Sequence, residues 1–285
     1  MNYRHHFHAG NFADVMKHVL LIELLERLNQ KDKPYRYIDT HAGAGIYDLS
    51  LAPSQKSGEY LEGIHRLVQL EPSVIRQAPD AIQRYLKLTH ELRDSMGKGW
   101  YGGSPWFAAQ QMREYDLATA FEMQPNVLDD LKFNLRDKRF GIHERDAYEG
   151  LLAVIPPKEK RGLVMIDPPY ELERKDFPQL VELLTNAHKK WSTGVFAVWY
   201  PIKDRAMIER FEKKMVKTGI RKQLICELCV WPDDTPVGLN GCGLLVINPP
   251  WQFADQADKL LQWLFPHLRM LDNGGHAAVR WLVGE

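Results

Sequence analysis

The feature that most constrains the fold of this chain is a regular alternation of strand-like and helix-like segments after residue 104. Buried or half-buried strand patterns recur at 117–122, 141–147, 163–167 and 194–201. Helical patterns separate these strands, over 105–113, 125–135 and 176–190 among others. Strands that alternate with helices predict a parallel sheet with helices on both faces. The predicted fold class is therefore α/β.

The last two predicted strands, 223–231 and 243–251, break this alternation because no helix separates them. Parallel neighbours need a long crossover, whereas antiparallel neighbours need only a turn. We therefore expect the two strands to form an antiparallel hairpin at one edge of the sheet, after a basic helix within 203–222.

Residues 52–103 have a different character from the rest of the chain. Residues 57–70 and 79–96 both have the pattern of amphipathic helices, and the strand–helix alternation resumes directly after them. We interpret 52–103 as an inserted helical subdomain. It would separate 1–51, which holds the N-terminal motif, a first helix capped by Asn11 and a glycine loop, from the remainder of the main domain at 104–285.

Composition limits the kind of protein this is. The chain has 285 residues and a formal net charge of zero, so any nucleic-acid site must be a local patch. The polar start MNYRHHFHAG cannot serve as a signal-peptide core, and no apolar run is long enough to cross a bilayer. We expect a cytoplasmic monomer that makes no membrane contact.

The three cysteines are Cys226, Cys229 and Cys242, an odd number that argues against a disulfide framework. Cys226 and Cys229 form a single C-x-x-C with no second ligand pair at similar spacing. Structural packing is therefore expected for them, and no metal site is predicted.

A glycine loop follows the first predicted strand, which Asp39 ends. In D-T-H-A-G-A-G, Gly43 and Gly45 permit a tight turn and a close approach of the backbone to a ligand. Position 48, where a dinucleotide fingerprint has its third glycine, is Asp48. This weakens an NAD interpretation.

Further polar residues fall where the next strands end, and ligands of such sheets bind outside these carboxyl ends. Glu122 suits the two hydroxyls of a ribose, and Asp146 suits an adenine amino group. Ser104–Pro105 has the form of a helix N-cap followed by a first-turn proline, which predicts a helix start that favours a ligand carboxylate.

The strand at 163–167 leads into Asp167-Pro168-Pro169-Tyr170. An exocyclic amine on a base is a poor nucleophile, because its lone pair is delocalised into the ring. A carboxylate and a proline carbonyl can accept hydrogen bonds from both N–H groups and so turn the nitrogen lone pair toward an electrophile. The prolines would hold these acceptors rigidly, and the tyrosine would give a face on which an extruded base stacks.

These features resemble the class I S-adenosylmethionine-dependent amino-methyltransferases, and Asp in first place resembles the adenine-N6 group. Further motifs match one family over nearly the whole chain: Y-R-H-x-F-H-A-G-N-x-A-D-V-x-K-H, D-K-P-Y-x-Y-x-D-T-H-A-G-A-G, G-E-Y-L-E-G-I, G-S-P, D-P-P-Y-E, W-Y-P, G-I-R-K and I-N-P-P-W. The chain is identified as a member of the bacterial 23S ribosomal RNA adenine-N6 methyltransferase J family. The resemblance implies a Rossmann-like methyltransferase fold with an inserted helical subdomain, and 23S rRNA, naked or partly assembled, as the partner.

The resemblance also implies roles for individual residues. The catalytic motif would be Asp167, Pro168, Pro169 and Tyr170. S-adenosylmethionine, which leaves as S-adenosylhomocysteine, would contact His18, His41, Gly43, Gly45, Ser104, Glu122, Asp146, Ala147 and Asp167. The RNA would contact Tyr3, His5 and Lys17. The family usually has glycine where this chain has Ala147.

Two other functions use the same features. The same site chemistry serves adenine in DNA, and a nucleic-acid-handling protein that takes part in the use of external DNA is the alternative from another class. The intact D-x-x-x-G-x-G, Glu122 and D-P-P-Y set argues against lost catalysis.

Three further motifs have weaker functional interpretations. Asn248-Pro249-Pro250-Trp251 mimics a catalytic motif but follows the strand predicted to be antiparallel, so it should point away from the site. His5, His6 and His8 suit a substrate groove or a solvated arm better than a metal. Residues 203–222 carry eight Lys/Arg against three acids, which suits RNA phosphates or a solvated helix face.

Overall fold

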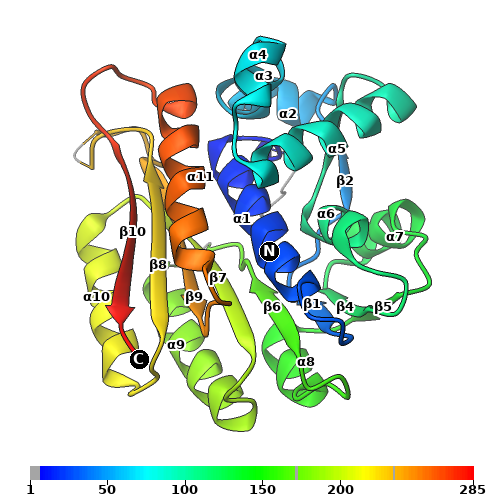
Figure 1. Ribbon diagram of the computed structural model, residues 1–285, viewed down its shortest axis with the longest axis vertical. Coiled ribbons are helices and arrows are strands. Elements are labelled where there is room, and N and C mark those ends of the chain that lie inside the picture. The colour runs from blue at the N-terminus through cyan, green and yellow to red at the C-terminus, as the bar shows by residue number, and fades with distance from the viewer. Residues whose placement is uncertain (1–6, 171–172, 234) are drawn as a thin grey trace.

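The computed structural model describes residues 7–170, 173–233 and 235–285. Within these ranges an eight-stranded sheet has the order β10-β8-β9-β7-β6-β1-β4-β5 (Figure 1). Its strands are β1 Arg36–Asp39, β4 Leu117–Glu122, β5 Phe140–Glu144, β6 Gly162–Ile166, β7 Val195–Ile202, β8 Gln223–Cys229, β9 Gly241–Ile247 and β10 His276–Val283.

The half of the sheet from β5 to β7 is parallel. Strand β1 lies between β4 and β6, and β5 and β7 extend this arrangement outward. Strand β6 is buried over its whole length, as the apolar run before Asp167 predicts. The predicted α/β class is confirmed, and the carboxyl ends of these strands gather at one edge of the sheet.

The predicted hairpin is confirmed, because β8 and β9 pair antiparallel. Strand β9 also pairs antiparallel with β7. The hairpin is not the edge, however, because β10 pairs with β8 outside it. The sequence H-A-A-V-R-W-L-V gives a weak strand pattern, since alanines and an arginine interrupt the apolar alternation. Hydrogen bonds to β8 stabilise this strand although its sequence pattern is weak, and the sequence analysis therefore missed it.

Helices cover both faces of the sheet (Figure 1). Those in the larger core are α1 Phe12–Asn29, α5 Asp80–Met96, α6 Ser104–Gln111 and α11 Phe253–Leu268. Those in the opposite core are α8 Ala147–Val154, α9 Glu173–Lys190 and α10 Arg205–Lys217. Helix α7, Pro125–Asn134, packs beside β4 and β5. The sequence analysis did not predict α11.

Helix α1 is buried nearly all round, because it packs against the sheet and against α5, α6 and α11. Its predicted N-cap is confirmed: the Asn11 side chain accepts a hydrogen bond from the Asp14 amide, 2.9 Å between N and O. No helix in the described part of the chain is long and apolar enough to cross a membrane.

Within the segment 52–103, residues 52–96 are helical and lie between two short paired strands, β2 Ile46–Asp48 and β3 Trp100–Gly102. Its elements before α5 are α2 Ala52–Ser57, η2 Glu59–Glu62, α3 Ile64–Val68 and α4 Pro72–Arg76. Side chains of α3 and α5 share the larger core with α1.

The continuous helix predicted over 57–70 is wrong. It is split at Gly63, where a Cβ would lie 2.2 Å from the carbonyl oxygen of Gly10. The helix breaks at Gly63 because the backbone at Gly10 approaches it closely there. An amphipathic sequence pattern gives no sign of such a tertiary contact.

Candidate active site

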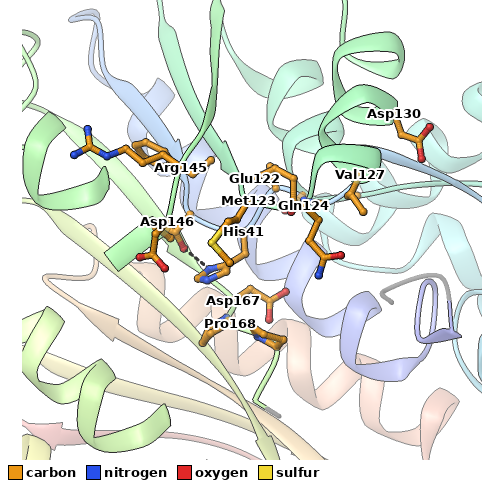
Figure 2. Close-up of a pocket in the computed structure, with 18 of the residues that line it drawn as sticks. His41, Glu122, Met123, Gln124, Val127, Asp130, Arg145, Asp146, Asp167 and Pro168 are labelled. Atoms are coloured by element: carbon orange, nitrogen blue, oxygen red, sulfur yellow. Dashed lines mark hydrogen bonds between the residues drawn. The ribbon is translucent and has the colours of Figure 1, made fainter. Parts of the chain in front are cut away.

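Two cavities open at the carboxyl edge of the parallel strands, and they meet at Asp167, Pro168 and Pro169. The first cavity, about 650 Å³, lies over the ends of β1, β4, β5 and β6 (Figure 2). The second cavity, about 680 Å³, lies between the start of the chain, the segment 52–103 and the carboxyl end of β7. Lys17 lines both cavities.

The glycine loop forms one wall of the first cavity. Gly43 has a φ of +63°, and a Cβ there would lie 2.1 Å from the Tyr47 hydroxyl oxygen, so only glycine fits without strain. Its amide donates to Glu122 Oε2, with 3.1 Å between N and O. The loop and the end of β4 are thereby joined at the cavity wall.

Glu122 lies at the end of β4, as predicted, and Figure 2 shows it beside Met123 and Gln124. Its second oxygen, Oε1, accepts from the Gln124 amide at 2.8 Å. Two backbone donors therefore hold the carboxylate in one orientation. A fixed carboxylate with remaining lone pairs suits two neighbouring hydroxyl groups.

Asp146 lies after β5 and caps α8, accepting from the amides of Tyr148 and Glu149. The next residue, Ala147, is buried and lines the same cavity, so its methyl group is accommodated. The acid predicted for an adenine amino group therefore has its side-chain orientation fixed by a helix start.

His41 lies in the wall between Asp146 and Asp167 (Figure 2). Burial lowers the pKa of His41 from 6.5 to about 4, against the opposing effect of the carboxylates of Asp167 and Asp146. The ring is within hydrogen-bond distance of the Thr40 hydroxyl, 2.8 Å from Nδ1 to Oγ1. His41 is thus a neutral group at physiological pH.

Ser104 lines the first cavity, but the prediction that it caps α6 is wrong. Gly103 is the cap residue and Ser104 is the first helical residue. The Ser104 hydroxyl donates instead to Asp39 Oδ2 at 2.7 Å. Asp39 is fully buried, and its carboxylate supports the wall from behind by also accepting from Tyr37 and the His41 amide.

Asp167 is the residue that the two cavities share. Its side chain is 16% exposed, and Oδ2 accepts from Lys17 Nζ at 2.7 Å. Lys17 is 4% exposed and also pairs with Asp14, 2.6 Å between Nζ and Oδ1. Burial alone lowers the pKa of Lys17, but the two carboxylates outweigh it and raise the pKa well above its usual value. Lys17 is therefore a charged anchor for Asp167.

Aromatic side chains line the second cavity around the D-P-P-Y turn. Tyr170 has a φ of +47° and is only 4% exposed. Its hydroxyl donates to the Trp199 carbonyl at 2.6 Å, and its ring lies 5.2 Å from that of Phe177. Tyr170, Trp199 and Trp231 all line this cavity. The turn therefore presents a carboxylate among flat apolar surfaces.

The structure brings most of the predicted residues together, with exceptions. Among the predicted cofactor residues, those lining the first cavity are His41, Gly43, Ser104, Glu122, Asp146, Ala147 and Asp167. Gly45 shapes the turn with a φ of +76° but does not line the cavity, nor does His18, which is buried against Tyr101 and Phe107. Tyr3 and His5 lie outside the described residues.

Sequence reasoning missed several residues of the walls. In the first cavity these include Thr40, Gln124, Asp130, Arg145 and Asp176. Gln124 and Arg145 are neighbours of strand-end acids, and that position was an available signal. The sequence analysis predicted no role for Trp199 of the W-Y-P motif or for Trp231, because nothing local in sequence places them beside Asp167.

One of the three motifs with weaker functional interpretations, Asn248-Pro249-Pro250-Trp251, is explained by its position. Asn248 follows β9 at the edge opposite the cavities, and its side-chain amide donates to the carbonyls of Ser192 and Gly194. Its lookalike motif is therefore a structural turn.

Cys229, Asp233 and His276 place potential metal-ligand atoms within 4.8 Å of one another. The Arg205 guanidinium, however, already donates to Cys229 Sγ and to Asp233. Burial raises the pKa of Cys229 to about 12, so the thiol is protonated rather than a ready metal ligand. Arg205 therefore accounts for the closeness of Cys229 and Asp233 in this group.

The sheet order, the acids after β4 and β5 and the D-P-P-Y turn after β6 define a class I, Rossmann-like methyltransferase fold. The chain belongs to the family described as ribosomal RNA large subunit methyltransferase D, RlmJ, whose model matches residues 32–283.

Relatives and a solved structure agree with this assignment. Two proteins called ribosomal RNA large subunit methyltransferase J match over 100% of both chains: that of Escherichia coli (strain K12) is 39% identical, and that of Haemophilus influenzae (strain ATCC 51907 / DSM 11121 / KW20 / Rd) is 40% identical. The crystal structure of protein LPL1258 from Legionella pneumophila, 34% identical, superposes with a TM-score of 0.84 over 96% of this chain and 98% of that one.

Proposed function

We propose that this protein transfers the methyl group of S-adenosylmethionine to the exocyclic N6 of an adenine in 23S rRNA. The observation that carries the proposal is the place of Asp167, at the junction of two cavities of similar volume. One cavity would take the methyl donor and the other the target base. A carboxylate between them is where an amine must be held for attack on a methyl group.

The first cavity fits S-adenosylmethionine by the chemistry of its walls. The fixed Glu122 carboxylate suits the ribose hydroxyls, and Asp146 suits the adenine amino group. The backbone at Gly43 permits the close approach of the ligand. Neutral His41 adds no positive charge to a site that must hold a sulfonium. When bound, the cofactor supplies an electrophilic methyl carbon.

In the proposed reaction, Asp167 and the Pro168 carbonyl accept hydrogen bonds from the two N–H groups of the amine. The nitrogen lone pair forms the new C–N bond while the C–S bond breaks and its electron pair stays on sulfur. The nitrogen would then lose one proton to the Asp167 carboxylate, which passes it to solvent, and a neutral secondary amine is restored. Lys17 stays protonated because its pKa is raised, so it holds the carboxylate in place and does not accept that proton.

The names of the relatives support the choice of partner. Both curated relatives carry the name of a large-subunit ribosomal RNA methyltransferase, which favours rRNA over DNA and over a non-catalytic role. We infer that the enzyme acts in the cytoplasm, as a monomer, on naked or partly assembled 23S rRNA. Its site carboxylates act on the amine directly, and the proposed step uses no metal.

The test is incubation of the protein with labelled S-adenosylmethionine and, separately, 23S rRNA, assembled large subunits and DNA. Nucleoside analysis of the products should show N6-methyladenosine from rRNA. Methylation of DNA alone would replace the proposed substrate. Absence of S-adenosylmethionine binding by calorimetry would remove the proposal at its base.

A further inference from the structure

The first described residues of the chain, 7–11, form one wall of the second cavity, and we call them the N-terminal arm. His8 and Asn11 of this arm line the cavity together with Trp199 and Trp231. The arm runs directly into α1, which carries Asp14 and Lys17 on its first turns. The position of the arm therefore sets one wall of the cavity. It also sets the start of α1, where Lys17 pairs with Asp14 and Asp167.

The arm is held by the segment 57–64, S-G-E-Y-L-E-G-I, and not by the sheet. Both carboxylate oxygens of Glu59 lie 3.0 Å from His8 Nδ1. A carboxylate only accepts, so the ring nitrogen must donate. Glu59 Oε2 also accepts from the side-chain amide of Asn11 at 2.9 Å. One side chain of the inserted segment thus ties two residues of the arm.

Backbone contacts fix the same junction independently. The Ile64 amide donates to the Gly10 carbonyl at 2.8 Å, and the Ser57 hydroxyl donates to the Phe7 carbonyl. Gly63 lets the two backbones touch, since a Cβ there would collide with Gly10 and Asn11. On the other side, Asp14 Oδ2 accepts from the Gly10 amide at 3.0 Å. Ties at several residues therefore hold the arm, and Glu59 supplies those to the side chains of His8 and Asn11.

We propose that Glu59 is a positioning residue for the RNA substrate, and that holding the N-terminal arm against the second cavity is a function of the inserted segment. The proposal rests on the proposed function, because it assigns the second cavity to the target nucleotide. Glu59 lines only the second cavity, so its loss should weaken RNA use and leave cofactor binding unchanged.

The test compares Glu59→Gln with Glu62→Gln. An amide in place of Glu59 accepts through one oxygen only, and its NH₂ group faces the donors of the arm. Glu62 lies three residues away, lines the same cavity and makes no hydrogen bond or ion pair with the described residues of the arm. It is a matched control for removal of one negative charge from the cavity.

For Glu59→Gln we expect kcat/KM for 23S rRNA to fall about tenfold or more, as for loss of charge-assisted hydrogen bonds, with an unchanged dissociation constant for S-adenosylmethionine. Glu62→Gln should lower kcat/KM less than Glu59→Gln does, because it removes the same charge from the cavity without breaking a contact to the arm. Equal losses in the two glutamine variants, or a faster Glu59→Gln enzyme, would overturn the proposal.

Hydrogen exchange gives a readout that needs no RNA. Amides of the N-terminal arm should exchange faster in Glu59→Gln than in wild type and Glu62→Gln. If wild type methylates no rRNA, the proposed function fails while this comparison still tests the arm. Unchanged exchange in Glu59→Gln would show that Glu59 does not hold the arm, whatever the enzyme methylates.

Discussion

The two cavities that meet at Asp167 are built in different ways. The first takes its polar groups from the ends of neighbouring parallel strands, such as Glu122 after β4 and Asp146 after β5. The second takes its walls from the N-terminal arm, from 57–64, from the end of β7 and from residues 231–239. These segments are far apart in sequence and share no periodicity.

The difference separates a cavity that the sheet topology produces from a cavity that depends on the loops and insertions of this chain. A parallel sheet places every carboxyl strand end at one edge, so the first cavity follows from topology. The second depends on which loops and insertions reach across that edge. Changes in the first cavity should therefore alter cofactor binding, changes in the second should alter RNA use, and changes at the junction should alter both.

The largest effect is expected at the junction. Asp167→Ala should abolish methylation while the fold is kept, because the side chain follows a strand end and serves the site. Asp167→Asn keeps one acceptor oxygen but removes the charge that offsets the developing positive nitrogen, so its rate should fall about 10²–10³-fold. Methyl incorporation and circular dichroism measure both. A near wild-type rate for Asp167→Ala would reduce D-P-P-Y to a turn.

Lys17 should show that the junction is also a structural element. Lys17→Met leaves the carboxylates of Asp14 and Asp167 without their shared cation, which should cost about 3–5 kcal/mol of unfolding free energy. RNA methylation should fall further than cofactor affinity in the molecules that remain folded. Urea unfolding checks the first statement, and unchanged stability would contradict the buried ion pairs.

Glu122→Ala should act on the first cavity alone. Loss of a charge-assisted bidentate partner for the ribose should weaken S-adenosylmethionine binding by about 1.5–3 kcal/mol, measured by calorimetry. KM for rRNA should stay at the wild-type value at saturating cofactor. Unchanged cofactor affinity would remove Glu122 from the site.

Tyr3 and His5 should affect the use of RNA and not the binding of the cofactor. Alanine at either position should lower RNA methylation about tenfold, the effect of one lost charge-assisted or polar contact, and leave cofactor affinity unchanged. Equal loss of methylation and of cofactor binding would instead indicate that these residues contribute to cofactor binding.

The smallest effect concerns His41 and pH. Its folded-state pKa of about 4 lies below the unfolded value of 6.5, so the unfolded chain binds more protons between these values. Stability should thus fall as pH falls from 6.5 toward 4, by about 1 kcal/mol near pH 5.5. His41→Gln, which has no titrating ring, should lose that part of the dependence in urea unfolding at pH 7.5 and 5.5. Parallel curves for the two proteins would contradict a buried neutral ring.

The sequence predicted the first cavity better than the second for a physical reason. Glu122, Asp146 and Asp167 end strands whose apolar runs are legible, and the sheet brings them together. The split of 57–70 at Gly63 and the role of Glu59 depend on contact with residues about fifty positions away. Ser104 was misplaced as a cap because its hydroxyl meets buried Asp39, a tertiary partner that local cap chemistry does not reveal.

The burial of α1 has a consequence for the order in which the molecule can assemble. This helix emerges during synthesis before the three helices that cover it, α5, α6 and α11, and α11 begins only at residue 253. Until then, a strongly apolar helix has nowhere to bury part of its surface. Until α11 is made, the surface of α1 that α11 covers must therefore stay exposed or be shielded by helper proteins, and a truncated chain that ends before α11 should aggregate.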